Sequence, residues 1–366
     1  MKKVLIVAAD GLSKSGVPNV FMNIIKNLSS KGFVFDVAYF DSEHTYHLKE
    51  IESFGGKAIY VKTNYGKKGK IKKLADKMRL GKRFKKILRE YGPYDIVHSF
   101  KGFESGYILK AAKRLKIQKR FTHSCFRYIK PHNPLVRFIE NMEIAKTKKY
   151  STNTIFDSLG NMNNNLPGFA KNILIRNYYN EDELGFSPLL DKEDSIKMVQ
   201  VGSYSSNKNQ KFSLELLERI LKEKPLSQLH FVGFPNADDP TYYEDLLQII
   251  KEKQLIASVF IHDFDAKLRD IFAKCNYCIF PSFIESFGIV PIEAQSVGLR
   301  CFCSDSIPHE NNVGGCFYLP LSNPDLWVSS ILEDYKQTHG EHSKFDLKAF
   351  SKDAINKQFL NLYSDE

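Results

Sequence analysis

Residues 281–304, PSFIESFGIVPIEAQSVGLRCFCS, hold the turn between two predicted strands on which the fold prediction depends. The apolar runs at 277–280, before the stretch, and 301–304, at its end, are typical of buried parallel strands. Between them we predict a helix that has Pro291 in its first turn and ends before Gly298. A strand, a glycine-containing loop and a helix N-terminus leave first-turn N–H groups unpaired, so the stretch predicts an anion-binding site.

Two acidic residues accompany this predicted helix end. Glu285 lies in the loop, and Glu293 lies eight residues further on, in the helix. Two carboxylates beside a phosphate-binding helix end are suited to hold sugar hydroxyls next to a phosphate. The alternative is that Glu285 is a solvated loop acid and Glu293 a first-turn charge favoured by the helix dipole. The spacing alone leaves both interpretations open.

The stretch also resembles a known signature, that of the retaining GT-B glycosyltransferases of family 4, which reads E-x7-E followed by Ala and Gly. The residues that carry the resemblance are Glu285, Phe287, Gly288, Ile289, Val290, Glu293, Ala294 and Gly298. The run 304–310, SDSIPHE, resembles the tail common in capsule, exopolysaccharide and O-antigen members. The resemblance implies a GT-B fold, in which two Rossmann-like β/α/β domains face each other across a cleft.

Length and composition agree with two α/β domains. A chain of 366 residues with 43% apolar content can bury two cores. Residues 1–180 hold 35 Lys and Arg against 13 Asp and Glu, whereas the remainder holds 18 against 29, which indicates two domains with different partners. No run of eighteen apolar residues occurs, so no transmembrane helix is predicted. Cys275-x2-Cys278 and Cys301-x-Cys303 lie near apolar runs without a matching histidine, so free buried cysteines are favoured over a zinc site.

The order of predicted elements places the domain boundaries. Strand and helix patterns alternate from the strand at 3–9 and again from the strand at 196–202, which predicts parallel sheets with right-handed crossovers. We predict an N-terminal domain over 1–180, a C-terminal domain over 181–346 and, over 347–366, a terminal helix that crosses back onto the first domain. Two further helices are expected near 44–54 and 156–163.

Residues 67–90 are strongly basic. Twelve of these twenty-four residues are Lys or Arg, and apolar residues recur between them at helical spacing. Such a helix can bind an anionic membrane surface. It can also be a helix that packs on the core with a solvated cationic face. Nucleic acid is not expected as the partner, because no recognition module accompanies the charge.

In the second domain the resemblance implies a site for a nucleoside diphosphate sugar. Glu293 would hold the ribose hydroxyls, and Glu285 would hold the sugar hydroxyls as a catalytic residue. The amides of Gly288, Ile289 and Val290, together with Lys208, would bind the diphosphate, and the backbone near Asp263 and Phe264 would border the base. Ser203 stands where the family has an arginine, so either another basic residue or a hydroxyl replaces it, with Arg176 and Lys211 as candidates, or activity is low.

In the first domain the resemblance implies that Gly16 approaches the donor phosphates and that His123, as a second catalytic residue, contacts the reacting end of the sugar. His98 and Asn177 match family positions with weaker roles. Both histidines lie at the carboxyl ends of predicted strands and are expected to face the cleft, although a lone histidine there is more often a hydrogen-bonded core residue.

The predicted activity is retaining transfer from a nucleoside diphosphate sugar, with UDP favoured, to a lipid-linked glycan or a lipopolysaccharide or capsule intermediate. No metal or other cofactor is expected, because basic side chains and a helix dipole replace a cation in this fold. The predicted location is the cytoplasm, peripheral on the inner face of the cell membrane. Two alternatives remain, a non-catalytic protein that binds sugar nucleotides and a cationic binder of membranes or nucleic acid.

Overall fold

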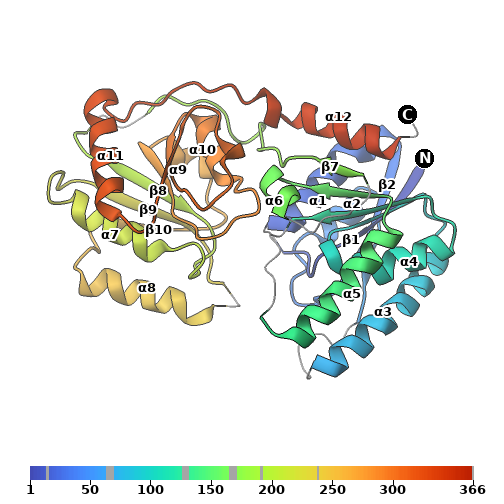
Figure 1. Ribbon diagram of the computed structural model, residues 1–366. Coiled ribbons are helices and arrows are strands. Elements are labelled where there is room, and N and C mark those ends of the chain that lie inside the picture. Colours follow the sequence, from blue (N-terminus) through green and yellow to red (C-terminus); the bar gives the residue numbers. More distant parts are fainter. Residues whose placement is uncertain are drawn as a thin grey trace. The chain divides into compact units, whose positions relative to one another are not determined.

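The computed structural model of the protein describes residues 1–13, 16–62, 70–125, 132–164, 171–189, 193–236 and 239–364 (Figure 1). The chain divides into two compact units. Unit 1 comprises Met1–Asn177 and Ile355–Glu366, and unit 2 comprises Tyr178–Ala354. Each unit contains one parallel sheet covered by helices, so the predicted α/β class is confirmed.

Unit 1 is built on a seven-stranded parallel sheet in the order β3-β2-β1-β4-β5-β6-β7. Its strands are β1 (Lys2–Val7), β2 (Phe33–Tyr39), β3 (Ala58–Tyr60), β4 (Ile96–Ser99), β5 (Lys119–Ser124), β6 (Asn153–Phe156) and β7 (Asn172–Leu174). The order reverses at β1, which is flanked by β2 and β4. In open α/β sheets such a switch point lies beside the ligand-binding crevice at the strands' carboxyl ends.

Helices cover both faces of this sheet. They are α1 (Gly16–Leu28), α2 (Leu48–Ser53), α3 (Lys70–Glu90), α4 (Gly106–Arg114), α5 (Pro134–Tyr150) and α6 (Leu159–Asn164). Among them, α4 packs against both α3 and α5. Leu80 and Phe84 of α3 and Ile108 of α4 pack with Leu5 and Val97 of the sheet, because apolar side chains at helical spacing form a stripe that the core buries.

The helix α12 (Lys352–Tyr363) returns to unit 1 and covers the sheet face opposite to α3 and α4. The Tyr363 ring stacks on Phe121 at 6.0 Å between centroids, and its hydroxyl shares a 2.6 Å hydrogen bond with Nδ1 of His98. Lys119 Nζ donates to the carbonyls of Leu362 and Tyr363 at 3.2 and 3.1 Å. A cation at a helix C-terminus is favourable because the last carbonyls have no partner within the helix.

Unit 2 is built on a six-stranded parallel sheet in the order β10-β9-β8-β11-β12-β13. Its strands are β8 (Lys197–Val201), β9 (Gln228–Gly233), β10 (Val259–Asp263), β11 (Tyr277–Phe280), β12 (Arg300–Ser304) and β13 (Cys316–Leu319). Its helices are α7 (Gln210–Ile220), α8 (Pro240–Glu252), α9 (Leu268–Phe272), α10 (Val290–Val297) and α11 (Pro324–Thr338). One core cluster contains Trp327 of α11, and another contains Ala294 of α10.

Local boundaries differ from the sequence prediction at three places. The helix expected near 44–54 is limited to α2. The helix expected near 156–163 is preceded by β6, whose Thr154, Ile155 and Phe156 are buried, so a strand occupies part of that range. The terminal helix expected to begin at 347 is interrupted at Ser351, where the backbone is extended (ψ 148°), and α12 begins one residue later.

Candidate functional site

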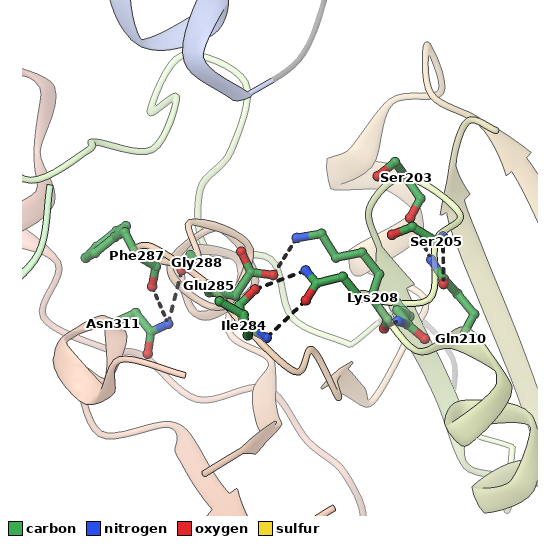
Figure 2. Close-up of polar contacts among 11 residues, drawn as sticks. Ser203, Ser205, Lys208, Gln210, Ile284, Glu285, Phe287, Gly288 and Asn311 are labelled. Carbon is green, nitrogen blue, oxygen red and sulfur yellow. Dashed lines mark hydrogen bonds and ion pairs between the residues drawn. The ribbon is translucent and has the colours of Figure 1, made fainter. Parts of the chain in front are cut away.

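An ion pair joins the two loops of unit 2 that the sequence analysis singled out. Lys208, in the loop between β8 and α7, places its Nζ 2.5 Å from a carboxylate oxygen of Glu285, in the loop between β11 and α10 (Figure 2). Both side chains are mostly buried, with 22% and 13% of the side-chain surface exposed. The Lys208 ammonium also lies 5.4 Å from the centroid of the Phe280 ring. The structure thus brings together the predicted sugar-binding acid and the predicted diphosphate-binding cation.

Backbone geometry holds Lys208 in this position. Gln200 of β8 donates from its side-chain amide to the Lys208 carbonyl at 2.6 Å. Gly202 has a φ of 150°, and a Cβ there would lie 3.4–3.5 Å from the lysine's methylene carbons. The lysine stem therefore runs directly over a glycine, whose positive φ disfavours any other residue.

Asn207 ties the two loops to each other. Its side-chain amide donates to the Ile284 carbonyl at 3.0 Å, and its side-chain oxygen accepts from the Ile284 N–H at 3.1 Å. Its own carbonyl accepts from the Phe283 N–H at 3.0 Å. Three hydrogen bonds from one residue hold the chain directly before Glu285, while the next residue, Lys208, carries the cation. Asn207 was not predicted from the sequence, because nothing local to its position indicates a contact with a residue 77 positions further on.

The loop that carries Glu285 is also fixed from the other side. Gly288 has a φ of 77°, and a Cβ there would come within 3.1 Å of both the Asn311 amide nitrogen and the Phe280 ring. The Asn311 amide donates to the carbonyls of Phe287 and Gly288 at 3.2 and 3.1 Å (Figure 2). Asn311 is completely buried, and its oxygen accepts from the Tyr318 hydroxyl at 2.6 Å. This buried asparagine is a second supporting residue that the sequence analysis missed.

The N-terminus of α10 presents free donors. In the described part of the chain, the backbone N–H groups of Gly288, Ile289 and Val290 have no acceptor, and the first intrahelical bonds begin at Ile292. Pro291 occupies the first turn and Gly298, at φ 116°, ends the helix, both as predicted. Unpaired first-turn N–H groups with the positive end of the helix dipole form an anion-binding site.

Glu293 lies in the first turn of the same helix. Its carboxylate has no hydrogen-bond or ion-pair partner among the residues that the structure describes. Burial raises the pKa of Glu293 to about 7, and the negative charge of Glu183 acts in the same direction. A carboxyl group with a raised pKa and no partner is suited to receive hydroxyl donors from a ligand, because these bonds favour the ionised form.

Ser203 and Lys211 make other contacts within unit 2. Gln210 donates from its amide to the Ser203 carbonyl at 3.0 Å (Figure 2), so the serine helps to order the loop. Lys211 pairs with Asp245 at 3.2 Å and lies over the Tyr242 ring. Lys211 is therefore engaged elsewhere in unit 2. Arg176 belongs to unit 1, directly after β7, and it has contacts of its own.

Three other residues predicted for the site, Asp263, Phe264 and Phe287, also lie in unit 2. Asp263 ends the edge strand β10, and the Phe264 ring that follows makes an edge contact with Phe234 at 5.1 Å between centroids. Phe287 is 2% exposed, and its ring packs with Ile292 in a small core cluster. The order of these elements follows the sequence prediction, while their contact with a nucleotide remains a prediction.

Unit 1 contributes the remaining predicted residues. Gly16 begins α1 with a φ of 27° and has open space where a Cβ would project; Ser15 before it lies outside the described residues. Asn177 ends the first segment of unit 1 and is half-buried. The loop that follows β5, from Phe126 onward, also lies outside the described residues.

His98 and His123 both lie in the interior of unit 1, under α12. Their rings stack at 5.4 Å between centroids, and both residues are 0% exposed. Among the residues that the structure describes, none is a hydrogen-bond partner for either ring nitrogen of His123, and burial lowers its pKa to about 3. His98 bonds to Tyr363, and burial together with the neighbouring His123 lowers its pKa as well. Both are therefore neutral core side chains here, and a contact of His123 with the donor sugar remains a prediction.

The cysteines and acids of the described residues include no metal-binding group of three or more ligands. All six cysteines are free, and Cys275, Cys278, Cys301 and Cys303 are buried. Nor does any helix in the described ranges combine the length and apolar character that a membrane crossing requires.

Comparison with known proteins identifies the class. Residues 183–313 match the family model described as glycosyl transferases group 1. A protein of Bacillus subtilis named as a glycosyltransferase, EpsF, is 23% identical over 349 residues, covering 90% of this chain and 87% of that protein. The capsular polysaccharide biosynthesis glycosyltransferase CapH of Staphylococcus aureus is 26% identical over 261 residues, covering 68% of this chain and 71% of that protein.

Among solved structures, Anabaena HepE in complex with UDP and glucose superimposes with a TM-score of 0.80 at 14% identity, covering 100% of both chains. The fold is therefore GT-B, as predicted. The residues that match this family model lie in unit 2 and include Lys208, Glu285 and Glu293. The protein is an enzyme of the glycosyltransferase class.

The raised pKa of Glu293 predicts that donor binding depends on pH, provided that Glu293 contacts the donor. If its carboxylate accepts hydroxyl bonds, the ligand binds the ionised form, so affinity is expected to rise by about tenfold between pH 6 and pH 8. Because the folded pKa lies above the ordinary value, the residue's contribution to the free energy of unfolding falls as the pH rises toward 7. Calorimetry with a UDP-sugar is suitable, since its phosphodiester groups do not titrate in this range. Glu293→Gln should give a flat profile; a steep profile in this variant would contradict the assignment.

The Asn207 contacts predict a selective effect on turnover. Asn207→Ala removes both side-chain bonds to Ile284 and should lower kcat by about tenfold, because Glu285 is held less firmly. Asn207→Asp retains only the acceptor and should be intermediate. The control is Asn323→Ala, which removes a side-chain bond to the Leu326 N–H at the start of α11. Equal loss of activity in Asn323→Ala would show that the Asn207→Ala effect comes from lower protein stability and not from the position of Glu285.

Proposed function

We propose that the protein transfers a sugar, with retention of configuration, from a UDP-sugar to a lipid-linked glycan or a lipopolysaccharide or capsule intermediate. The observation that carries the proposal is the ion pair of Lys208 and Glu285 beside the free N–H groups at the start of α10. The HepE complexes with UDP and glucose support UDP as the nucleotide, and the names of EpsF and CapH support a polysaccharide product.

In this proposal, the diphosphate binds at the N–H groups of Gly288, Ile289 and Val290 and at Lys208. As the glycosidic bond breaks, negative charge grows on the leaving diphosphate, and fixed donors stabilise it without reorganisation. Glu285 accepts bonds from the sugar hydroxyls and shares Lys208 with the diphosphate.

Glu293 accepts bonds from the ribose, and the backbone near Asp263 and Phe264 borders the base. We assign the acceptor side to unit 1, over about residues 1–180, with Gly16 near the phosphates and His123 near the reacting end of the sugar. His98, Asn177 and Arg176 are supporting residues at lower priority.

The proposed chemistry uses no metal ion. A basic side chain and a helix dipole supply the positive charge that a divalent cation would supply in other transferases. Assays with and without EDTA test this directly, and complete loss of transfer in EDTA that Mg²⁺ restores would contradict it.

We further propose that the enzyme acts at the cytoplasmic face of the membrane, bound peripherally through residues 67–90 and without a nucleic-acid partner. In the described part of this range, Leu80, Phe84 and Leu88 are buried in the core of unit 1, while Arg79, Lys82, Lys86 and Arg89 are exposed.

The decisive experiment is a thermal-shift screen with UDP-, GDP- and ADP-sugars, followed by a transfer assay with the stabilising donor. We expect a UDP-sugar to raise Tm and to be consumed when an acceptor is present. Stabilisation without any transfer or donor hydrolysis would favour a protein that only binds sugar nucleotides. Ser203 favours that second candidate function, because Lys208 is then without the family's second cation.

A further inference from the structure

The cationic surface of unit 1 is wider than the basic sequence stretch. Helices α3, α4 and α5 form one layer. Helix α3 holds ten Lys or Arg and two Asp or Glu, α4 holds three and none, and α5 holds four and two. Outward-facing cations on the three helices include Lys82, Lys86 and Arg89, then Lys113 and Arg114, then Lys149. An open depression of about 400 Å³ is lined by Lys82, Lys85, Lys86, Arg89 and Glu90.

The outer helix α5 adds an apolar stripe to this layer. Leu135, Phe138 and Met142 are 55%, 61% and 37% exposed, and Ala145 and Lys149 continue the same line. The spacing of i, i+3, i+7, i+10 and i+14 places all five on one side of the helix. The opposite side, with Glu143, Ile144 and Thr147, is the buried one.

We propose that the outer face of α3, α4 and α5 docks on an anionic lipid bilayer, with Leu135, Phe138 and Met142 inserted among the acyl chains. The inference rests on the proposed function in one respect, since it names the part of unit 1 that meets the membrane. Cations alone would suit a bilayer or a nucleic acid equally. The apolar stripe beside them favours the bilayer, because a phosphate backbone offers no apolar surface for Phe138 to enter.

The two parts of the face make separable contributions. Each Lys or Arg near an anionic surface strengthens binding by about fivefold, and this part weakens with salt. The apolar side chains strengthen binding through burial, and this part resists salt. Two groups of variants can therefore be compared on the 366-residue chain.

The experiment is sedimentation with vesicles of phosphatidylcholine alone or with 30% phosphatidylglycerol. Lys82→Ser/Lys86→Ser/Arg89→Ser should weaken binding to the anionic vesicles by about 100-fold. Leu135→Asn/Phe138→Ser should weaken it by about tenfold, with the difference from wild type preserved at 0.5 M NaCl.

Controls come from unit 2. Lys222→Ser/Lys251→Ser/Lys274→Ser removes the same charge from exposed positions, and Leu226→Asn/Ile256→Ser alters two apolar side chains that are each 66% exposed. Both should bind as wild type does.

Insertion is measured with Phe138→Trp and brominated lipids. The natural Trp327 is 0% exposed in unit 2, so its emission gives an unquenched background, and the new tryptophan should be quenched. Wild-type binding by Leu135→Asn/Phe138→Ser, or no quenching in Phe138→Trp, would overturn the insertion.

Tighter binding to duplex DNA or RNA than to anionic vesicles would overturn the bilayer assignment. Donor-dependent thermal shifts and donor hydrolysis without vesicles report on the proposed function separately, and we expect these variants to retain both.

Discussion

Replacement of Glu285 by glutamine is expected to lower the rate of glycosyl transfer by roughly 10²- to 10³-fold, with donor affinity changed only a few-fold. Glutamine keeps the size of the side chain and loses its charge. The amide has one oxygen to accept sugar hydroxyl bonds, and it no longer holds the Lys208 ammonium at 2.5 Å. The cation and the sugar are then positioned less firmly while the three N–H groups at α10 remain.

The measurement for Glu285→Gln is a steady-state assay that separates kcat from donor binding by calorimetry. The matched control is Glu215→Gln, which breaks a 2.6 Å pair with Arg219 on α7, away from the site. Full activity of Glu285→Gln would contradict the assignment of Glu285 as the sugar-binding acid. A comparable loss in Glu215→Gln would show that the assay reports a general effect of losing an ion pair.

Replacement of Lys208 by methionine is expected to have a similarly large effect, but on donor affinity as well as turnover. Methionine retains an apolar stem near Phe280 and over Gly202, and it removes the ammonium that pairs with Glu285 in the loop before α10. We expect donor affinity to fall by about 10- to 100-fold and kcat by at least that much, because charge-assisted bonds to a diphosphate are lost.

Stability measurements distinguish the two roles of this lysine. Lys208→Met leaves the Glu285 carboxylate mostly buried without its cation, which should cost about 1–3 kcal/mol of unfolding free energy. The double variant Lys208→Met/Glu285→Gln should recover part of that stability and none of the activity. Lys211→Met is the control, since its ammonium pairs with Asp245 at the surface. Unchanged donor affinity in Lys208→Met would contradict the diphosphate assignment.

The sequence predicted the parallel α/β units well because buried strands and amphipathic helices leave local patterns. The α10 region illustrates this, since Pro291 and Gly298 mark its ends through backbone preferences that hold in any context. The strand β6 was missed for the opposite reason: its four residues, Asn153–Phe156, are too few to show a period, and their burial comes from pairing with β5 and β7.

In the candidate site, too, some residues could be named from the sequence and others only from the structure. Lys208, Glu285 and Glu293 were named through the resemblance to a family signature, and the structure pairs Lys208 with Glu285. The supports, Asn207 and Asn311, were not readable, since an asparagine in a loop has no pattern that reveals its distant partner. His98 and His123 were expected to face an open cleft, and the structure buries both because α12, more than two hundred residues later, lies over them.

The return of α12 to unit 1 has a consequence for biosynthesis. Residues 355–366 are synthesised after the whole of unit 2. Until then, α12 does not cover His98, Phe121 and His123 of unit 1, whereas unit 2 can already fold. Domains usually fold as units during synthesis, and an exposed apolar face invites aggregation meanwhile. Chains that stop at Ala354 should therefore accumulate as insoluble protein, although every residue of unit 2 is present.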